Sequence, residues 1–218
     1  MPLKLYYHPL ASFCWKALIA LYENAVPFEP ILVDLGEERS RDAFLAVYPI
    51  GKFPVINHDG RIVPGSASII EYLSLHFEDR AGLVPRDAEA ALEARIQDRF
   101  YDAYVHEQMQ KIVLDRLRPP GETDPAGVAA ARAQIRTAYD VIENGMASRQ
   151  WACGDAFTMA DCAAAPALFY ANKVEGLQAR HDTVKAYLER LKARPSFARV
   201  LREAEPYFKF FPARDGDT

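Results

Sequence analysis

The chain has 218 residues, half of them hydrophobic, and a formal net charge of −4. Residues 1–80 contain 7 Lys/Arg and 10 Asp/Glu, and residues 81–218 contain 19 and 20, so neither half is basic. This balance argues against a dedicated nucleic-acid surface, and no apolar run approaches the ~20 residues that span a membrane. Three scattered cysteines argue against a disulfide framework, and the histidines have no metal-ligand spacing. We therefore expect a reduced, cytoplasmic protein without a metal.

Strand and helix patterns alternate in the first third of the chain. The expected elements are a strand at 3–7, a helix at 12–24, a strand at 28–33, a helix at 39–46, strands at 53–57 and 61–63, and a helix at 66–77. Ser12 and Ser66 are the expected N-caps of their helices, and Asp59-Gly60 is a hairpin turn signal. The order βαβ, hairpin, helix indicates a thioredoxin-like domain, because parallel pairing needs the crossover helix.

The remainder of the chain has helical patterns almost to its end. After a Gly- and Pro-containing linker, helices are expected at 88–117, at 125–147 after the N-cap Asp124, and at 158–171, 183–193 and 196–204. Thr158-Met159-Ala160-Asp161 fits a capping box, in which the threonine hydroxyl and the acid each accept a backbone N–H. An aromatic tail around Phe208 follows the last helix. The chain is therefore predicted to be α+β, with an all-helical second part.

Two short motifs in the first part carry the functional information. Pro54 interrupts an apolar strand and cannot donate to a sheet, so Phe53–Pro54 is a candidate cis peptide bond that leaves neighbouring backbone groups free for an extended ligand. Ten residues later, Gly65-Ser66 opens a helix, whose N–H groups and hydroxyl form an anion site. Together the motifs predict a pocket for a small peptide with a carboxylate.

These motifs resemble the glutathione site of the glutathione transferase superfamily, and the resemblance extends over nearly the whole chain. Theta-, zeta- and beta-like features suggest a bacterial-type cytosolic member. The resemblance implies a thioredoxin-like glutathione-binding domain at 1–79, a linker at 80–87, and an all-helical bundle domain at 88–218 that forms the second-substrate pocket. The family has a capping box in the corresponding helix, preceded by residues like Gly154-Asp155. Members are commonly homodimers, with the first half of one chain against the helical half of the other.

The resemblance also implies which residues bind glutathione. Phe53, held by Pro54, would present its backbone to the cysteinyl part, and Lys52 would bind the glycyl carboxylate. Arg39 occupies a place where theta-like members have another donor for that carboxylate. Ser66 would bind the γ-glutamyl carboxylate through its hydroxyl and N–H.

Gly65 departs from the family pattern. Most members have Glu or Gln at this position, where the side chain binds the ammonium group of the ligand. Losing a charged hydrogen-bond partner of this kind costs roughly 1.5–3 kcal/mol.

A hydrogen-bond donor near the glutathione sulfur favours the thiolate, which is scarce at neutral pH for a free thiol. Ser12 is the first candidate for this donor, because it opens the first helix. Alignment with beta-like members puts Ser12 opposite their cysteine, whereas alignment with zeta-like members puts Ala11 opposite the serine often assigned as catalytic. The alternates are Cys14, which could form a mixed disulfide, and Tyr7, which matches the catalytic tyrosine of the mammalian alpha, mu and pi classes.

The expected second-substrate pocket borders the long helix and the aromatic tail, with Leu10, Tyr104, Gln108 and Phe208 as its residues. The leading hypothesis is a glutathione transferase that conjugates glutathione to an apolar, small-molecule electrophile, as in detoxification. One alternative is a non-catalytic binding module that has lost glutathione, for which Gly65 is the best support. A further alternative is glutathione-dependent isomerase or thiol–disulfide chemistry through Cys14.

Overall fold

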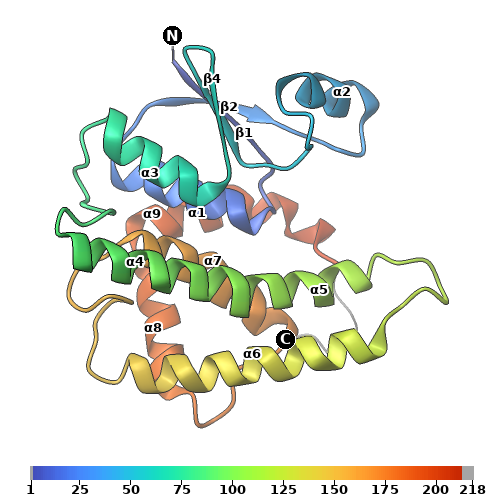
Figure 1. Ribbon diagram of the computed structural model, residues 1–218. Helices are drawn as coiled ribbons and strands as arrows, with labels where there is room; N and C mark the ends of the chain where they lie inside the picture. Colours follow the sequence, from blue (N-terminus) through green and yellow to red (C-terminus); the bar gives the residue numbers. More distant parts are fainter. Residues whose placement is uncertain (1, 213–218) are drawn as a thin grey trace.

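The structure is a computed structural model that describes residues 2–212. An α/β part lies above a helical part in the view of Figure 1, which confirms the predicted α+β architecture. The α/β part consists of β1 (Leu3–Tyr7), α1 (Ser12–Glu23), β2 (Phe28–Leu32), α2 (Glu38–Val47), β3 (Val55–His58), β4 (Arg61–Pro64) and α3 (Ser66–His76). The helical part consists of α4 (Ala88–Phe100), η1 (Tyr101–His106), α5 (Glu107–Asp115), α6 (Pro125–Gly145), α7 (Met159–Val174), α8 (Asp182–Ala193), α9 (Pro195–Ala204) and η2 (Glu205–Phe210).

The sheet has the strand order β2-β1-β3-β4. Because α1 crosses over between β1 and β2, these two strands run parallel, whereas β3 is antiparallel to both β1 and β4. Helices α1 and α3 pack on one face of the sheet, and α2 packs on the other face, where Phe44 contacts Val33 and Val55. The predicted hairpin turn is confirmed, and the positive φ angles of Asp59 (51°) and Gly60 (88°) are those of a type I′ turn.

The hairpin register brings the two sequence motifs together. The Phe53–Pro54 peptide bond is cis, as predicted from the proline inside a strand-like run. Val55 at the start of β3 is paired with Pro64 at the end of β4, so the residues that flank this pair are also neighbours. The N–H of Gly65 donates to the carbonyl of Pro54 at 3.0 Å. The cis peptide bond therefore lies directly beside the N-terminus of α3.

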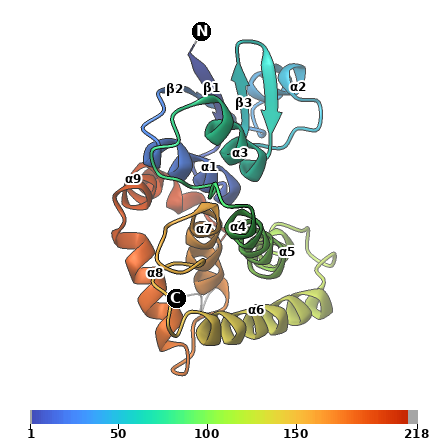
Figure 2. The ribbon, with the colours of Figure 1, turned by 60° about the vertical axis from the view of Figure 1, so that its left-hand side comes forward.

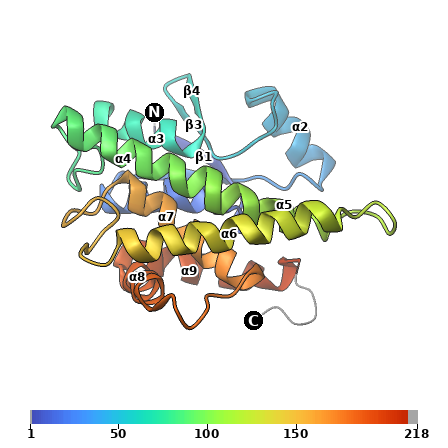
Figure 3. The ribbon, with the colours of Figure 1, turned by 60° about the horizontal axis from the view of Figure 1, so that its bottom comes forward.

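The helical part is arranged around α7, which is buried along most of its length. Figure 3 shows α4 and α5 running beside α6, with α7 behind them, and Figure 2 shows α7 between α4 and α8. The α/β part packs onto α7 through α1, whose Trp15 ring lies 4.6 Å from Tyr170 and 5.3 Å from Phe169. No helix within residues 2–212 combines the length and the apolar character needed to cross a bilayer.

The predicted long helix at 88–117 is continuous but not regular. Between α4 and α5, the six residues of η1 form a π-helical turn, in which the N–H of Glu107 donates to the carbonyl of Asp102. A π-helical turn holds one residue more than an α-helical turn and is frequent at functional sites. Asp102 and His106 lie on this turn, and both side chains point toward α1, as their bonds to Lys16 and Ser12 require.

The structure corrects two expected helix caps. Ala11, not Ser12, is the N-cap of α1, and the Ser12 hydroxyl instead contacts His106 at 2.5 Å. Gly65, not Ser66, is the N-cap of α3 and has φ of 83°, a conformation that glycine adopts without a Cβ penalty. Both serines are therefore the first residue of their helix. The sequence pattern placed each cap one residue too late because serine is the stronger cap former.

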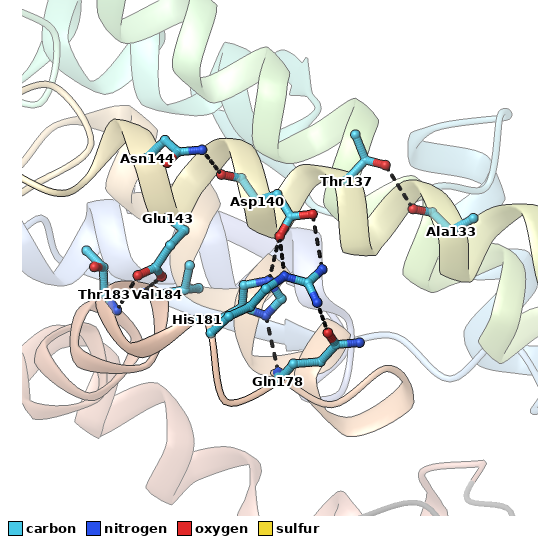
Figure 4. A network of polar contacts seen from close by, with 10 residues as sticks. Ala133, Thr137, Asp140, Glu143, Asn144, Gln178, His181, Thr183 and Val184 are labelled. Carbon is cyan, nitrogen blue, oxygen red and sulfur yellow. Dashed lines mark hydrogen bonds and ion pairs between the residues drawn. The ribbon is translucent and has the colours of Figure 1, made fainter.

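A polar network fixes the turn before α8 onto α6 (Figure 4). The Asp140 carboxylate accepts hydrogen bonds from Arg180 at 2.9 and 3.1 Å and lies 2.9 Å from the buried Nε2 of His181. The bonds from Arg180 and His181 lower the pKa of Asp140 to about 2. Glu143, one turn further along α6, accepts from the first backbone N–H groups of α8, at Thr183 and Val184. The negative side chains of α6 thus satisfy the N-terminus of α8.

The predicted capping box of α7 is confirmed and belongs to a larger buried group. Thr158 accepts from the N–H of Ala160, and Asp161 accepts from the N–H of Thr158 at 2.8 Å. The second oxygen of Asp161 accepts from the N–H of Ala152 at 2.8 Å and from the Tyr187 hydroxyl at 2.5 Å. Asp161 is fully buried. One carboxylate therefore joins α7, α8 and the loop before α7.

We expect Asp161→Ala to lower the free energy of unfolding by at least about 3 kcal/mol, because three buried donors lose their acceptor at about 1–3 kcal/mol each. The matched control is Asp87→Ala, which removes an exposed N-cap with one bond, to the N–H of Ala90, and is expected to cost about 1 kcal/mol. Urea unfolding followed by circular dichroism measures both. Equal losses in the two variants would contradict the structural role of Asp161.

Candidate functional site

A cavity of about 460 Å³ lies between the start of α3 and η1, and we call it the α3–η1 cavity. One wall comes from the cis-proline loop and the start of α3, and includes Lys52, Phe53, Pro54, Gly65 and Ser66. The opposite wall comes from α4, η1 and α5, and includes Arg99, Asp102, Ala103 and Glu107. The structure thus brings five of the residues expected to bind glutathione into one cavity.

The wall formed by α3 is suited to an anionic group. The first N–H groups of a helix have no partner within the helix, and the helix dipole makes this end positive. Ser66 is 5% exposed and is the first residue of α3, so its hydroxyl and N–H lie beside these groups. Lys52 contributes a cationic side chain to the same cavity. This end of the cavity can therefore bind a carboxylate.

Arg39 lies apart from the α3–η1 cavity. It is an exposed residue on α2 and borders a separate hollow formed with Tyr6 and Phe44, on the far face of the sheet. The sequence shows where Arg39 lies along the chain but does not show which face of α2 its side chain occupies.

A second cavity of about 310 Å³ lies between α5 and the aromatic tail, and we call it the α5–tail cavity. Its lining residues are Leu10, Ala11, Ser12, Met109, Gln110, Val113, Leu114, Leu117, Tyr170, Phe210, Phe211 and Pro212. None of these side chains is charged. The cavity is suited to an apolar molecule. The start of α1 borders both cavities, since Ser12 lines this one and the next residue, Phe13, lines the α3–η1 cavity.

Three of the four residues expected in the second-substrate pocket lie outside the α5–tail cavity. Tyr104 is half-exposed on η1, and the Gln108 amide donates to the carbonyl of Ala103 at 2.9 Å. The 3₁₀ turn η2 directs Phe208 toward Phe169, at 5.8 Å between ring centroids. Only Leu10 lines the cavity, and the aromatic tail contributes Phe210 and Phe211 instead.

Ser12 is held by a histidine from the other end of the fold. Its hydroxyl lies 2.5 Å from Nε2 of His106, and the Phe13 ring stacks on the same imidazole at 3.7 Å. Burial, together with the charge of Lys16, lowers the pKa of His106 to about 3, so the imidazole is neutral at physiological pH. A neutral imidazole with its proton on Nε2 donates to the serine oxygen and leaves the hydroxyl proton free for another acceptor.

One turn along α1, Lys16 is buried in an ion cluster. Its ammonium lies 2.6 Å from an oxygen of Asp98 and 2.8 Å from an oxygen of Asp102, and both Lys16 and Asp98 are almost inaccessible. Ser12 and Lys16 are four residues apart on α1, as are Asp102 and His106 on η1. The two helical segments therefore face each other with two successive polar contacts, one turn apart.

Sequence analysis missed the pairing of Ser12 with His106 and the roles of Lys16, Asp98 and Asp102. A signal was present, because Lys16 is the one charged residue in the otherwise apolar face from Phe13 to Leu21. Charged side chains are rarely buried without a partner. Ser12 and Lys16 are four residues apart, as are Asp102 and His106. This equal spacing could then have suggested that the partners of Lys16 are acids on the long helix.

The alternates to Ser12 have less suitable surroundings. Cys14 is completely buried, and burial raises the pKa of its thiol to about 12, so it is not a thiolate at neutral pH. Tyr7 lines a third cavity of about 750 Å³ between α1, β2 and α9. No residue lining this third cavity lines the α3–η1 or the α5–tail cavity. Within residues 2–212, no group of three His, Cys, Asp or Glu side chains is arranged to bind a metal ion.

Comparison with known proteins identifies the family. A family model described as the N-terminal domain of glutathione S-transferase matches residues 5–81, and one described as its C-terminal domain matches residues 125–190. Glutathione S-transferase 3 of Zea mays is 32% identical over 210 residues, which cover 92% of this chain and 93% of the relative. A maleylpyruvate isomerase of Ralstonia is 26% identical over 94% of this chain and 99% of its own.

Solved structures agree with these matches. A glutathione S-transferase of Methylobacterium radiotolerans in complex with glutathione sulfonate superposes with a TM-score of 0.80 and 27% identity, covering 92% of this chain and 94% of that one. The matches to both domains and to nearly full-length relatives agree with the order of elements described above. The chain belongs to the glutathione S-transferase family.

Proposed function

We propose that this protein is a glutathione transferase, which binds reduced glutathione in the α3–η1 cavity and transfers it to an apolar electrophile in the α5–tail cavity. The observation that carries the proposal is the position of Ser12, at the start of α1, which borders both cavities. A thiol that reaches this point from the first cavity faces both a hydroxyl donor and a molecule in the second cavity.

Glutathione is assigned to the α3–η1 cavity by the chemistry of its walls. The γ-glutamyl carboxylate binds Ser66 and the first N–H groups of α3, and Lys52 binds the glycyl carboxylate. The backbone of Phe53, beside the cis peptide bond to Pro54, pairs with the cysteinyl residue between them. Arg39 does not line this cavity, so we assign it no role. Residues 1–79 thus form the glutathione-binding domain, joined by residues 80–87 to the helical domain at 88–218.

Ser12 stabilises the thiolate by donating a hydrogen bond from its hydroxyl to the sulfur. His106 fixes the serine oxygen through Nε2, and the N-terminus of α1 adds a positive potential at the same point. Both effects lower the pKa of the bound thiol and raise the fraction of thiolate at neutral pH. The thiolate then attacks an electrophilic carbon of the second substrate, so that a carbon–sulfur bond forms and the bond to the leaving group breaks; with an aryl halide, the leaving group departs as halide with the bonding electrons.

The α5–tail cavity favours an apolar electrophile over an anionic one, because none of the described side chains that line it is charged. This lining does not support glutathione-dependent isomerisation of an anionic substrate. The burial of Cys14 does not support thiol–disulfide chemistry. A role in detoxification, in the cytoplasm, accords with an apolar pocket and three free cysteines.

A homodimer accords with the exposed apolar residues around the junction of α3 and α4. Glu71 on α3 and Arg95 on α4 form an ion pair at 2.6 Å, which holds the two helices together. Leu75, Leu92 and Ile96 lie within one turn of this pair and are 78%, 50% and 51% exposed. A second copy that packs its own α3 and α4 against this face would bury them, with two-fold symmetry.

Ser66→Ala is expected to weaken glutathione binding at least roughly tenfold, because it removes a hydrogen bond to a charged carboxylate worth about 1.5–3 kcal/mol. Calorimetric titration with reduced glutathione measures the loss, and we expect micromolar to low-millimolar binding by the unmodified protein. Ser68→Ala, at an exposed position in the same cavity, is the matched control. Absence of binding at several millimolar glutathione would refute the transferase assignment.

Ser12→Ala is expected to lower kcat/KM roughly ten- to hundredfold, through loss of a hydrogen bond to the thiolate. Because the bound thiol then titrates at a higher pH, the rise of activity with pH should move to higher pH. Initial rates with an aryl halide electrophile at several pH values measure both effects. Cys14→Ala is the control and should leave the pH profile in place, whereas a loss of activity in that variant would favour Cys14 chemistry.

Ile96→Asp should shift the protein from dimer to monomer in sedimentation velocity, since a carboxylate at the proposed interface loses hydration on association. Val141→Asp, at a similarly exposed position on α6, should leave the sedimentation coefficient unchanged. A monomer in the unmodified protein, or identical behaviour of the two variants, would exclude an interface on α3 and α4.

A further inference from the structure

The γ-glutamyl end of glutathione carries a carboxylate and an ammonium group, and the α3 wall is suited to the carboxylate alone. An α-amino acid keeps its ammonium group two bonds from its carboxylate. A carboxylate bound at Ser66 therefore brings the ammonium into the same cavity. Gly65 has no side chain to receive it, and Glu71, the next acid along α3, is engaged by Arg95 at 2.6 and 3.0 Å. The negative partner must come from another wall.

We propose that Asp102, on η1, binds the α-ammonium group of the γ-glutamyl residue in place of a side chain at position 65. This inference rests on the proposed binding of glutathione in the α3–η1 cavity. Asp102 lines that cavity on the wall opposite Gly65 and Ser66, and 13% of its side chain is exposed. One carboxylate oxygen contacts Lys16 at 2.8 Å. Among the described residues, its other oxygen is buried and accepts no hydrogen bond.

The charges around Lys16 leave room for a second cation. One ammonium is shared by two carboxylates, those of Asp98 and Asp102, so the cluster carries one negative charge in excess when both are ionised. Within residues 2–212, no other cation forms an ion pair with either carboxylate. An incoming ammonium group at Asp102 would balance the cluster. A carboxylate in such a poorly solvated position interacts more strongly with a cation than one in water does.

Two other acids near the cavity are weaker candidates. Asp98 is completely buried and does not line the cavity, so a ligand cannot reach it. Glu107 lines the cavity from α5 but is exposed, so water competes with any cation that it binds. The two residues therefore serve as controls, because each shares one property with Asp102 and lacks the other.

A side chain at position 65 would meet backbone strain. Gly65 has φ of 83°, which L-residues rarely adopt, although a Cβ would meet only the Ser68 hydroxyl, at 4.0 Å. The obstacle to a side chain is thus the backbone conformation and not a lack of space. An acid on the opposite wall provides the charge without this strain.

The test compares two ligands on five proteins. Glutathione and glutaryl-cysteinyl-glycine, which lacks only the α-amino group, are titrated calorimetrically into the full-length protein and into Asp102→Asn, Glu107→Gln and Asp98→Asn. We expect the unmodified protein to prefer glutathione roughly ten- to hundredfold. Asp102→Asn should abolish this preference while it still binds the deaminated peptide, whereas Glu107→Gln should keep it and Asp98→Asn, which removes the excess charge but leaves the carboxylate of Asp102, should keep part of it. Thermal unfolding verifies that each variant is folded, and Asp102→Glu, which retains the charge, should keep part of the preference.

A folded Asp102→Asn that still prefers glutathione would overturn the assignment. Loss of the preference in Glu107→Gln alone would overturn it in favour of Glu107, and equal loss in Asp98→Asn would mean that the charge of the whole cluster acts and not a contact at Asp102. If the unmodified protein binds both peptides equally, no acid binds the ammonium group, and the inference fails while the proposed function stands. If it binds neither, the proposed function itself fails.

Discussion

The contact between α1 and η1 is the interaction on which the proposed site depends. It joins the two halves of the chain through Ser12–His106 and Lys16–Asp102, between residues more than 80 positions apart. The surrounding packing is apolar, since Trp15 is buried against aromatic side chains of α7 and α9. Hydrophobic burial supplies most of the stability, and the polar pairs fix the register of one helix against the other. The start of α1 borders both cavities because this register brings their walls together.

Burying the charged side chains of this contact costs free energy of folding. Placing Lys16 and two aspartates away from water is expensive unless each is well paired, and the pairing here is incomplete. Burial, the largest influence, raises the pKa of Asp98 above its usual range. Incomplete pairing in a native structure calls for an explanation, and a charged ligand in the adjoining cavity provides one.

Much of the fold follows from local rules that a single sequence displays. The hairpin at Asp59-Gly60, the capping box of Thr158 and Asp161, and the cis bond before Pro54 each depend on residues within a few positions of one another. One wall of the α3–η1 cavity could be predicted for the same reason, since Lys52 to Ser66 belong to one hairpin and the residues that flank it. Its other wall could not, because Asp102 and Glu107 come from a distant helix. Phe208 was expected in a pocket that Phe210 and Phe211 line, since a 3₁₀ turn decides which aromatic faces inward.

The π-helical turn at η1 has a consequence for how this sequence tolerates change. Such a turn is equivalent to one additional residue within an α-helix. The wider turn absorbs this residue, so deleting one residue within η1 can restore regular α-helical bonding without rotating the flanking helices. Deleting a residue from the regular part of α4 or α5 would instead rotate the segments on its two sides by about 100° relative to one another. Length is therefore constrained more tightly in α4 and α5 than in η1, although both helices lie far from Pro54 and Ser66 in the chain.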